Sequence, residues 1–233
     1  YYGMGMTTVS SGIGPLDDIL QGLRDGDNVV WQVDRLEDYS FFAEPFARKH
    51  LQLGEHVVYV RFAAHPPVLP ELDGLEVIRV DPRAGFDYFS RIIHQIIEER
   101  GRRINYIFDN LSSLVASWAT DELLANFFQV TCPFLYELDT VAYFALTRGL
   151  HAHGTVARIR DTTQVLIDVY RVAGQTFLHP LKVWDRYSPQ MFLPHLVGNQ
   201  WQPLATSGDA AGLSMQARPH PLRRPIPSIA PWE

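Results

Sequence analysis

The sequence predicts an α/β fold with a mainly parallel central sheet flanked by helices and antiparallel strands added at its C-terminal end. Two observations lead to this prediction. Up to about Thr147, short runs of β-branched and aromatic residues alternate with segments whose apolar residues recur at helical spacing, which is typical of right-handed βαβ units. Beyond that point, successive strands are separated only by short turns, most simply an antiparallel extension of the sheet.

The first predicted elements are a short helix, a buried strand and a second helix. Pro15 marks the start of a short amphipathic helix that Gly22 and Gly26 close. A buried strand is predicted at Asn28–Val33, and a loop then leads to a helix near Tyr39–Leu53. Strand, loop and helix in this order is where many α/β proteins hold a phosphate.

The remaining elements follow from the length and period of the apolar pattern. Phe86–Arg100 has a clear helical period. Leu123–Leu138 is also predicted as helix, and Pro133 within it is expected to kink or divide it. The other predicted strands are His56–Phe62, Glu76–Val80, Ile104–Asp109, Thr140–Thr147, Thr163–Val172, Gln175–Val183 and Met191–Val197.

The composition is that of an ordinary globular chain. We expect one domain at residues 11–203, a flexible N-terminus at 1–10, and a Pro/Arg-rich tail or linker at 204–233. The net charge of −6 gives no bulk attraction to nucleic acid or anionic membranes. The single cysteine, Cys132, fits a reducing compartment. No signal peptide or apolar run of ~18 residues is apparent, so we expect a soluble, cytoplasmic protein without membrane association.

The loop after the first strand lacks the chemistry of a phosphate site. Such a loop needs glycines, so that backbone N–H groups converge on the anion, and a lysine for the outer phosphates. Neither residue occurs between Asn28 and Ser40, where Asp34, Glu37 and Asp38 would instead repel a triphosphate.

Three segments, in their order, nevertheless resemble the RecA-like ATPases, and specifically their KaiC-like branch. Thr8–Gly26 is similar to that family's lead-in to its first strand, Tyr106–Asp109 resembles its Walker B strand, and His179–Val183 resembles the late strand that carries an interface lysine, here Lys182. The phrase Gly26–Asp34 resembles, more closely, KaiC-like segments ahead of PEP/pyruvate-binding regions in bacterial phosphoenolpyruvate-synthase-like proteins. The resemblance implies a RecA-like fold.

Two parts of the catalytic machinery of that family are missing. The phosphate-loop positions carry Asp38 and Tyr39 where the family has Gly and Lys, and only Ser40 remains as a candidate metal-binding hydroxyl. Ala63 and Ala64 stand where the family carries paired glutamates that activate water. The degenerate phosphate-loop position comprises Val33, Asp34, Arg35, Leu36, Glu37, Asp38, Tyr39 and Ser40.

Other candidate sites each have a structural alternative. Asp109 matches the Walker B carboxylate that holds the water shell of Mg²⁺, but it can equally cap the next segment or bond the amides of Ser112 and Ser113. A basic set is a candidate anion site or subunit interface at the C-terminal rim, or an ordinary salt-bridged surface. Its members are Arg148, Arg158, Arg160, Lys182 and Arg186.

The histidines, the cysteine and the aromatic residues give weaker signals. The spacing of His151 and His153, together with His65, is weak evidence for a zinc site. A solvated loop is the simpler interpretation. Cys132 is expected to be buried. Tyr39, with Phe41 and Phe42, is expected to be core, although such residues can stack on a nucleobase.

The sequence therefore predicts a catalytically inactive RecA/KaiC-like domain that acts in protein interaction, oligomerisation or regulation, with a link to PEP/pyruvate phosphotransfer proteins implied by the resemblance. No cofactor or metal is expected, and ATP with Mg²⁺ is disfavoured. One alternative is a non-standard nucleotide or phosphometabolite binder that uses the basic set. A second alternative is a nucleic-acid-binding RecA relative, which the acidic balance disfavours.

Overall fold

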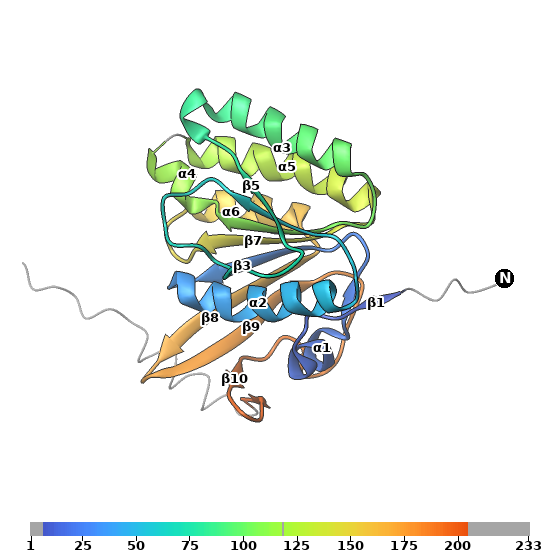
Figure 1. The fold of residues 1–233 in the computed structure, drawn as a ribbon. Coiled ribbons are helices and arrows are strands. Elements are labelled where there is room, and N and C mark those ends of the chain that lie inside the picture. The colour runs from blue at the N-terminus through green and yellow to red at the C-terminus, as the bar shows by residue number, and fades with distance from the viewer. Residues whose placement is uncertain (1–6, 118, 205–233) are drawn as a thin grey trace, which may run out of the picture.

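A computed structural model describes residues 7–117 and 119–204. Nine strands form one sheet in the order β11-β10-β9-β8-β3-β7-β6-β4-β5, with helices on both faces (Figure 1). The α/β class, the mainly parallel sheet and its antiparallel C-terminal extension are thereby confirmed.

The parallel part of the sheet is built around β3. All six residues of β3 (Asn28–Val33) are buried, and the strand lies between β7 (Val141–Thr147) and β8 (Val165–Val172), parallel to both. Because a parallel strand covered on both faces is buried on both sides, β3 is mostly apolar and has no regular polar alternation, although Asn28 and Gln32 within it are polar. Outside β7 follow β6 (Asn105–Asn110), β4 (Val57–Arg61) and β5 (Glu76–Arg79).

The antiparallel part begins at a tight turn. β8 pairs with β9 (Gln175–Val183), and the turn between them has Ala173 and Gly174 at φ 50° and 77°, as a two-residue hairpin requires. β10 (His195–Val197) and β11 (Gln202–Pro203) complete this edge.

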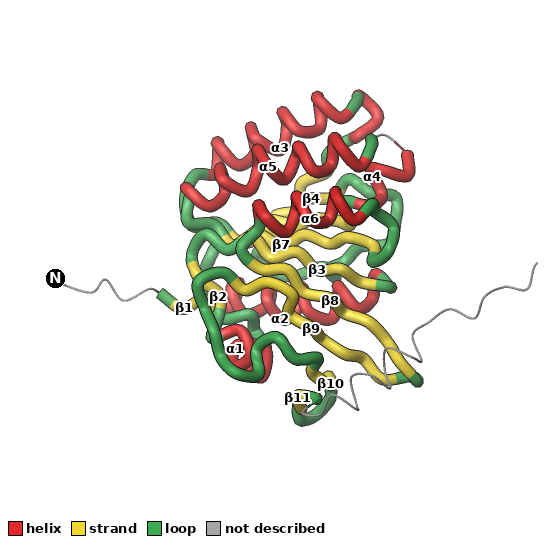
Figure 2. The backbone as a smooth tube through the Cα atoms, turned by 180° about the vertical axis from the view of Figure 1, so that it is seen from behind, coloured by secondary structure: helices red, strands yellow, loops and turns green. Residues whose placement is uncertain are grey.

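Helices cover the two faces of the sheet unequally. One face carries α3 (Phe86–Arg100), α5 (Asp121–Glu137) and α6 (His153–Thr162), and the other carries α2 (Leu36–Gln52) and α1 (Gly14–Leu20), as Figures 1 and 2 show from opposite sides. The remaining helical elements are a 3₁₀ helix at Pro82–Ala84 and the short α4 at Ser112–Ser117.

Each face has its own apolar core. Under α2, Trp31 stacks on Phe42 with ring centroids 4.5 Å apart, and Tyr143 stacks on Phe46 at 4.3 Å. On the other face, Phe108 of β6 is one of the large side chains buried beneath α3 and α5. None of the described helices is both long and apolar enough to cross a membrane.

Glycine fixes the approach of the N-terminal segment to α2. Gly12 has φ +82°, and a Cβ atom there would lie 2.2 Å from the carbonyl oxygen of Pro45. Gly54, just after α2, has φ +73° but no heavy atom within 4 Å of its Cβ position. Of these two glycines, Gly12 is the one that combines a left-handed backbone with a backbone contact that leaves no room for a side chain.

Several sequence predictions need correction. The helix expected near Tyr39–Leu53 begins at Leu36, because the acidic Glu37 and Asp38 favour the first turn of a helix. Pro133 does not divide the helix expected at Leu123–Leu138: α5 is continuous through it, since buried residues on both sides hold it against the sheet.

The ends of the chain and the histidine loop also differ. Part of the flexible segment expected at 1–10 is a strand, β1 (Thr8–Val9), paired with β2 (Leu23–Arg24). The loop expected around His153 is the first turn of α6, which has Ile159 as its buried residue and hence only a weak helical pattern. Of the predicted tail at 204–233, residues 205–233 lie outside the described residues.

Candidate functional site

The connection between β3 and α2 is short. Only Asp34 and Arg35 separate Val33, the last residue of the strand, from Leu36, the first of the helix. Arg35 is the N-cap residue and no side chain caps the helix. Positions 36–40 are therefore helical and cannot form the wide backbone loop that surrounds a phosphate.

An ion pair secures the first turn of α2 to β8. Arg171 donates from Nη2 and Nε to one carboxylate oxygen of Asp38, at 2.9 and 3.2 Å. Asp38 is buried, and among the described residues its other oxygen, Oδ2, has no hydrogen-bond partner. The hydrogen bonds that Arg171 donates to Asp38 raise the pKa of its guanidinium. Asp38, which the resemblance places at a glycine position of a phosphate loop, is thus a paired carboxylate.

A second arginine bridges the neighbouring strand ends. Arg148, just after β7, lies 3.8 Å from Asp34 and 3.5 Å from Asp168, measured between its guanidinium nitrogens and the carboxylate oxygens. Its guanidinium also lies over the ring of Tyr170, 4.9 Å from the centroid. Burial raises the pKa of Asp168, and Arg148 opposes this shift. The guanidinium of Arg148, which could otherwise bind a phosphate, is therefore paired with the carboxylates of Asp34 and Asp168.

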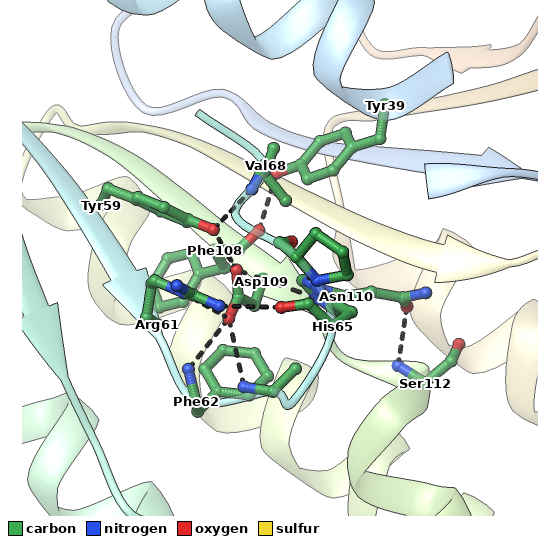
Figure 3. A network of polar contacts seen from close by, with 12 residues as sticks. Tyr39, Tyr59, Arg61, Phe62, His65, Val68, Phe108, Asp109, Asn110 and Ser112 are labelled. Atoms are coloured by element: carbon green, nitrogen blue, oxygen red, sulfur yellow. Dashed lines mark hydrogen bonds and ion pairs between the residues drawn. The ribbon is translucent and has the colours of Figure 1, made fainter. Parts of the chain in front are cut away.

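Tyr39, which the resemblance places at the lysine position of a phosphate loop, points into the protein. Its side chain is fully buried and its hydroxyl donates to the carbonyl oxygen of Phe108, at 2.9 Å (Figure 3). Burial raises the pKa of the phenol well above its usual value. Tyr39 is therefore a core residue that joins α2 to β6, and Phe42 beside it is also core.

Asp109, which the resemblance places at a Walker B position, is held by neighbouring groups (Figure 3). The Tyr59 hydroxyl donates to Oδ1, and the backbone N–H groups of Phe62 and Ala63 donate to Oδ2 at 3.0 and 3.1 Å. A register shift between β6 and β7 at residues 107–110 accompanies this arrangement, and such bulges redirect side chains. Asp109 is completely buried.

The segment after β4 closes over this carboxylate. Ala63 reaches Asp109 through its backbone, so the position at which the resemblance predicts a glutamate supplies an N–H donor instead of a base. His65 accepts from the Asn110 N–H at Nε2 and donates from Nδ1 to the Pro66 carbonyl, at 3.2 and 2.8 Å. These roles describe a neutral imidazole, so the 3.9 Å approach of His65 to Asp109 is not an ion pair. Ala64 lies in the same connection.

The structure also shows a chain of hydrogen bonds that sequence reasoning missed. Ser112 Oγ lies 2.6 Å from His151 Nε2, and His151 Nδ1 lies 2.7 Å from Asp121 Oδ1, the order of groups in a serine hydrolase. However, Ser112 is 2% exposed and its Oγ also accepts from the Thr147 N–H at 2.8 Å. A substrate cannot approach it in this conformation. The chain of bonds joins the starts of α4 and α5 to the end of β7.

Asn110, and not Asp109 as expected, accepts the hydrogen bond from the amide of Ser112. Asn110 Oδ1 accepts from the Ser112 N–H at 3.0 Å, whereas Asp109 bonds the segment after β4. No local pattern in the sequence identifies the role of His151, because its partners Ser112 and Asp121 are distant along the chain.

The five basic residues do not gather at one rim. Arg148 is at the carboxyl end of the parallel strands, whereas Lys182 pairs with the start of β8 and donates to the carbonyl oxygen of Arg160 at 2.5 Å. Arg158 donates from α6 to side chains of α5. Arg186 is buried and forms two hydrogen bonds to Asp27, at 2.9 and 3.1 Å.

The remaining candidates show no metal chemistry. Within residues 7–117 and 119–204, no group of three or more His, Cys, Asp or Glu side chains could hold a metal ion. Cys132 is buried, which raises the pKa of its thiol. Phe41, beside the buried Phe42, is 55% exposed and so is not the core residue that the sequence predicted.

A comparison of the chain with models of known protein families finds no match. A comparison with curated proteins finds none either.

Proposed function

We propose that this chain is a catalytically inactive domain of the RecA/KaiC-like kind that acts through protein interaction. One observation carries the proposal. Where an ATPase would place its phosphate loop, a two-residue connection leads directly into α2, and paired carboxylates surround its first turn. Phosphoryl transfer needs a cation and a positioned water at this place, whereas Asp34 and Asp38 hold the nearby arginines.

The Walker B position supports the same conclusion. A carboxylate that positions Mg²⁺ must keep an oxygen accessible to the water shell of the ion. Asp109 is fully buried, and both of its oxygens accept hydrogen bonds from Tyr59, Phe62 or Ala63. Its present role is to fasten the segment after β4 to β6.

Exposed aromatic residues supply a contact surface at the opposite end of the strands, where β9 ends beside the start of β8. Trp184 is 47% exposed and Tyr187 is 71% exposed, and the Trp184 ring meets Tyr136 edge-on with centroids 6.1 Å apart. Aromatic residues of this kind are enriched in protein interfaces and dominate their binding energy. We assign self-association to this aromatic surface, and a link to PEP/pyruvate phosphotransfer proteins rests on the resemblance of Gly26–Asp34.

Calorimetric titration with MgATP tests the loss of nucleotide binding. We expect no saturable heat for the wild-type protein. Micromolar binding that is abolished by both Ser40→Ala and Asp109→Ala would overturn the proposal, because it would show that the two surviving positions still form a nucleotide site.

Sedimentation velocity tests the interaction. We expect the wild-type protein to sediment as an oligomer and the double variant Trp184→Ser/Tyr187→Ser to shift towards the monomer. Tyr88→Ser is the matched control, because Tyr88 is also exposed, at 38%, but lies on α3. A wild-type protein that remains monomeric at all concentrations would contradict self-association.

A further inference from the structure

A cavity of about 530 Å³ opens at the outer edge of the sheet, on the face that α2 covers. Its floor is formed by β4 and β5, and one wall is formed by the segment 67–71. Its lining includes Arg61, Arg79, Val77, Pro67, Pro70 and Glu71. The cavity is separate from the start of α2, so ligand binding in it does not depend on the proposed function.

Two arginines are placed side by side in this cavity. Arg61 and Arg79 are direct partners in the register of the parallel strands β4 and β5, so their side chains leave the same face of the sheet. Like charges directly opposite each other on neighbouring strands repel and destabilise the pairing. An anion between the two guanidinium groups would remove this repulsion.

Arg61 is held in position. Its side chain is 15% exposed, its Nη2 donates to the His65 carbonyl at 2.8 Å, and its Nε lies 3.7 Å from Asp109 (Figure 3). Arg61 and Asp109 form an ion pair, in which Asp109 also accepts hydrogen bonds from Tyr59 and two backbone N–H groups. The Arg61 guanidinium is therefore ordered before any ligand arrives, which lowers the entropy cost of binding.

Arg79 is left without an acidic partner among residues 7–117 and 119–204. The neighbouring acids are engaged elsewhere: Glu76 pairs with Arg100, and Asp81 pairs with Arg83. Glu71, the one carboxylate of the cavity lining, forms no ion pair with either cavity arginine in that part of the chain. The planar fork of Arg79 thus remains open to an oxyanion.

We propose that this cavity binds a small phosphate monoester or a comparable dianion. Arg61 and Arg79 hold the charged oxygens, since guanidinium groups recognise phosphate and carboxylate through two parallel hydrogen bonds. The exposed Val77 and the prolines at 67 and 70 contact the organic part of the ligand. Glu71 at the wall disfavours ligands that carry negative charge along their whole length.

The test uses inorganic phosphate as the probe, with succinate as a dicarboxylate dianion for comparison, at constant ionic strength. Thermal unfolding reports binding, and NMR of the arginine Nε–Hε groups reports its location. We expect phosphate to raise the Tm and to shift the Arg61 and Arg79 signals. Arg79→Gln should weaken the binding about tenfold or more, because it removes one charge-assisted pair. Arg61→Lys keeps the positive charge but removes the planar guanidinium that forms two parallel hydrogen bonds, so it should weaken phosphate binding too.

Arg91→Gln is the matched control, because Arg91 is exposed on α3, on the other face of the sheet, and changes the net charge equally. Its phosphate titration should equal that of the wild type. Identical titrations of the wild type and Arg79→Gln would overturn the proposal, as would the lack of any response to phosphate and succinate at millimolar concentration. Stronger binding of succinate than of phosphate would overturn the phosphate assignment.

Discussion

Replacement of Asp109 distinguishes a structural carboxylate from one kept for a metal ion. In Asp109→Ala the hydroxyl of Tyr59 and the N–H groups of Phe62 and Ala63 lose their acceptor. Each buried donor left unpaired costs ~1–3 kcal/mol, and loss of one partner of a buried charge pair costs about 3–5 kcal/mol. Since Ala63 is partly exposed and can regain water, we expect a loss of about 3–5 kcal/mol.

Urea unfolding monitored by circular dichroism measures this loss. For a domain of this size it corresponds to a decrease in Tm of roughly 10 °C. Tyr59→Phe removes the hydroxyl that donates to Asp109 and accepts from the Val68 N–H, and should cost about 2–3 kcal/mol. In a double-mutant cycle the two changes should cost less together than their sum, because they remove the same hydrogen bond.

Asp18→Ala serves as the control, since Asp18 is an exposed carboxylate on α1 and its removal should change stability by less than about 0.5 kcal/mol. A cost of under about 1 kcal/mol for Asp109→Ala would refute the reasoning. It would mean that the carboxylate is not needed by its neighbours and is available to a ligand.

Three further changes test other parts of the structure. Gly12→Ala should cost at least about 3 kcal/mol, and Gly54→Ala only about 1 kcal/mol, because both need a left-handed backbone but only the first meets a helix carbonyl; equal costs in urea unfolding would contradict the contact. The hydrogen bond from His151 lowers the pKa of Asp121, so its stabilisation is present above the unfolded pKa near ~3.9 and lost as pH falls through the lower folded value. The stability difference between the wild type and Asp121→Asn should therefore shrink below about pH 4, whereas a difference independent of pH would argue against the pair. Ser112 should not react with a fluorophosphonate, and Ser112→Ala should cost about 1–2 kcal/mol; labelling seen by mass spectrometry would show an accessible nucleophile.

The strands could be predicted because their signal is local. β3 and β9 match the predicted strands at Asn28–Val33 and Gln175–Val183 at both ends, since each is a run of apolar or alternating residues bounded by turn residues. α3 also has the predicted bounds, Phe86–Arg100, because its apolar period is strong. The start of α2 was misplaced because acidic residues are common both in loops and in first helical turns.

The site was less predictable than the fold, for a physical reason. The sequence shows which residues stand at the end of a strand, but it does not show which backbone groups turn towards them. Asp109 was identified as a candidate, yet its partners Phe62 and Ala63 contribute N–H groups that any residue except proline could supply. Likewise, Arg61 and Arg79 become neighbours only once the register of β4 and β5 is known.

The early start of α2 has a consequence for protein design. A nucleotide loop could not be introduced into this chain by exchanging side chains at positions 33–40. Tyr39→Lys would direct an ammonium group into the buried space that the phenol now fills, at a high desolvation cost. The backbone would first have to unwind by about one turn and gain length with glycines, so insertion libraries rather than substitution libraries are the appropriate way to search.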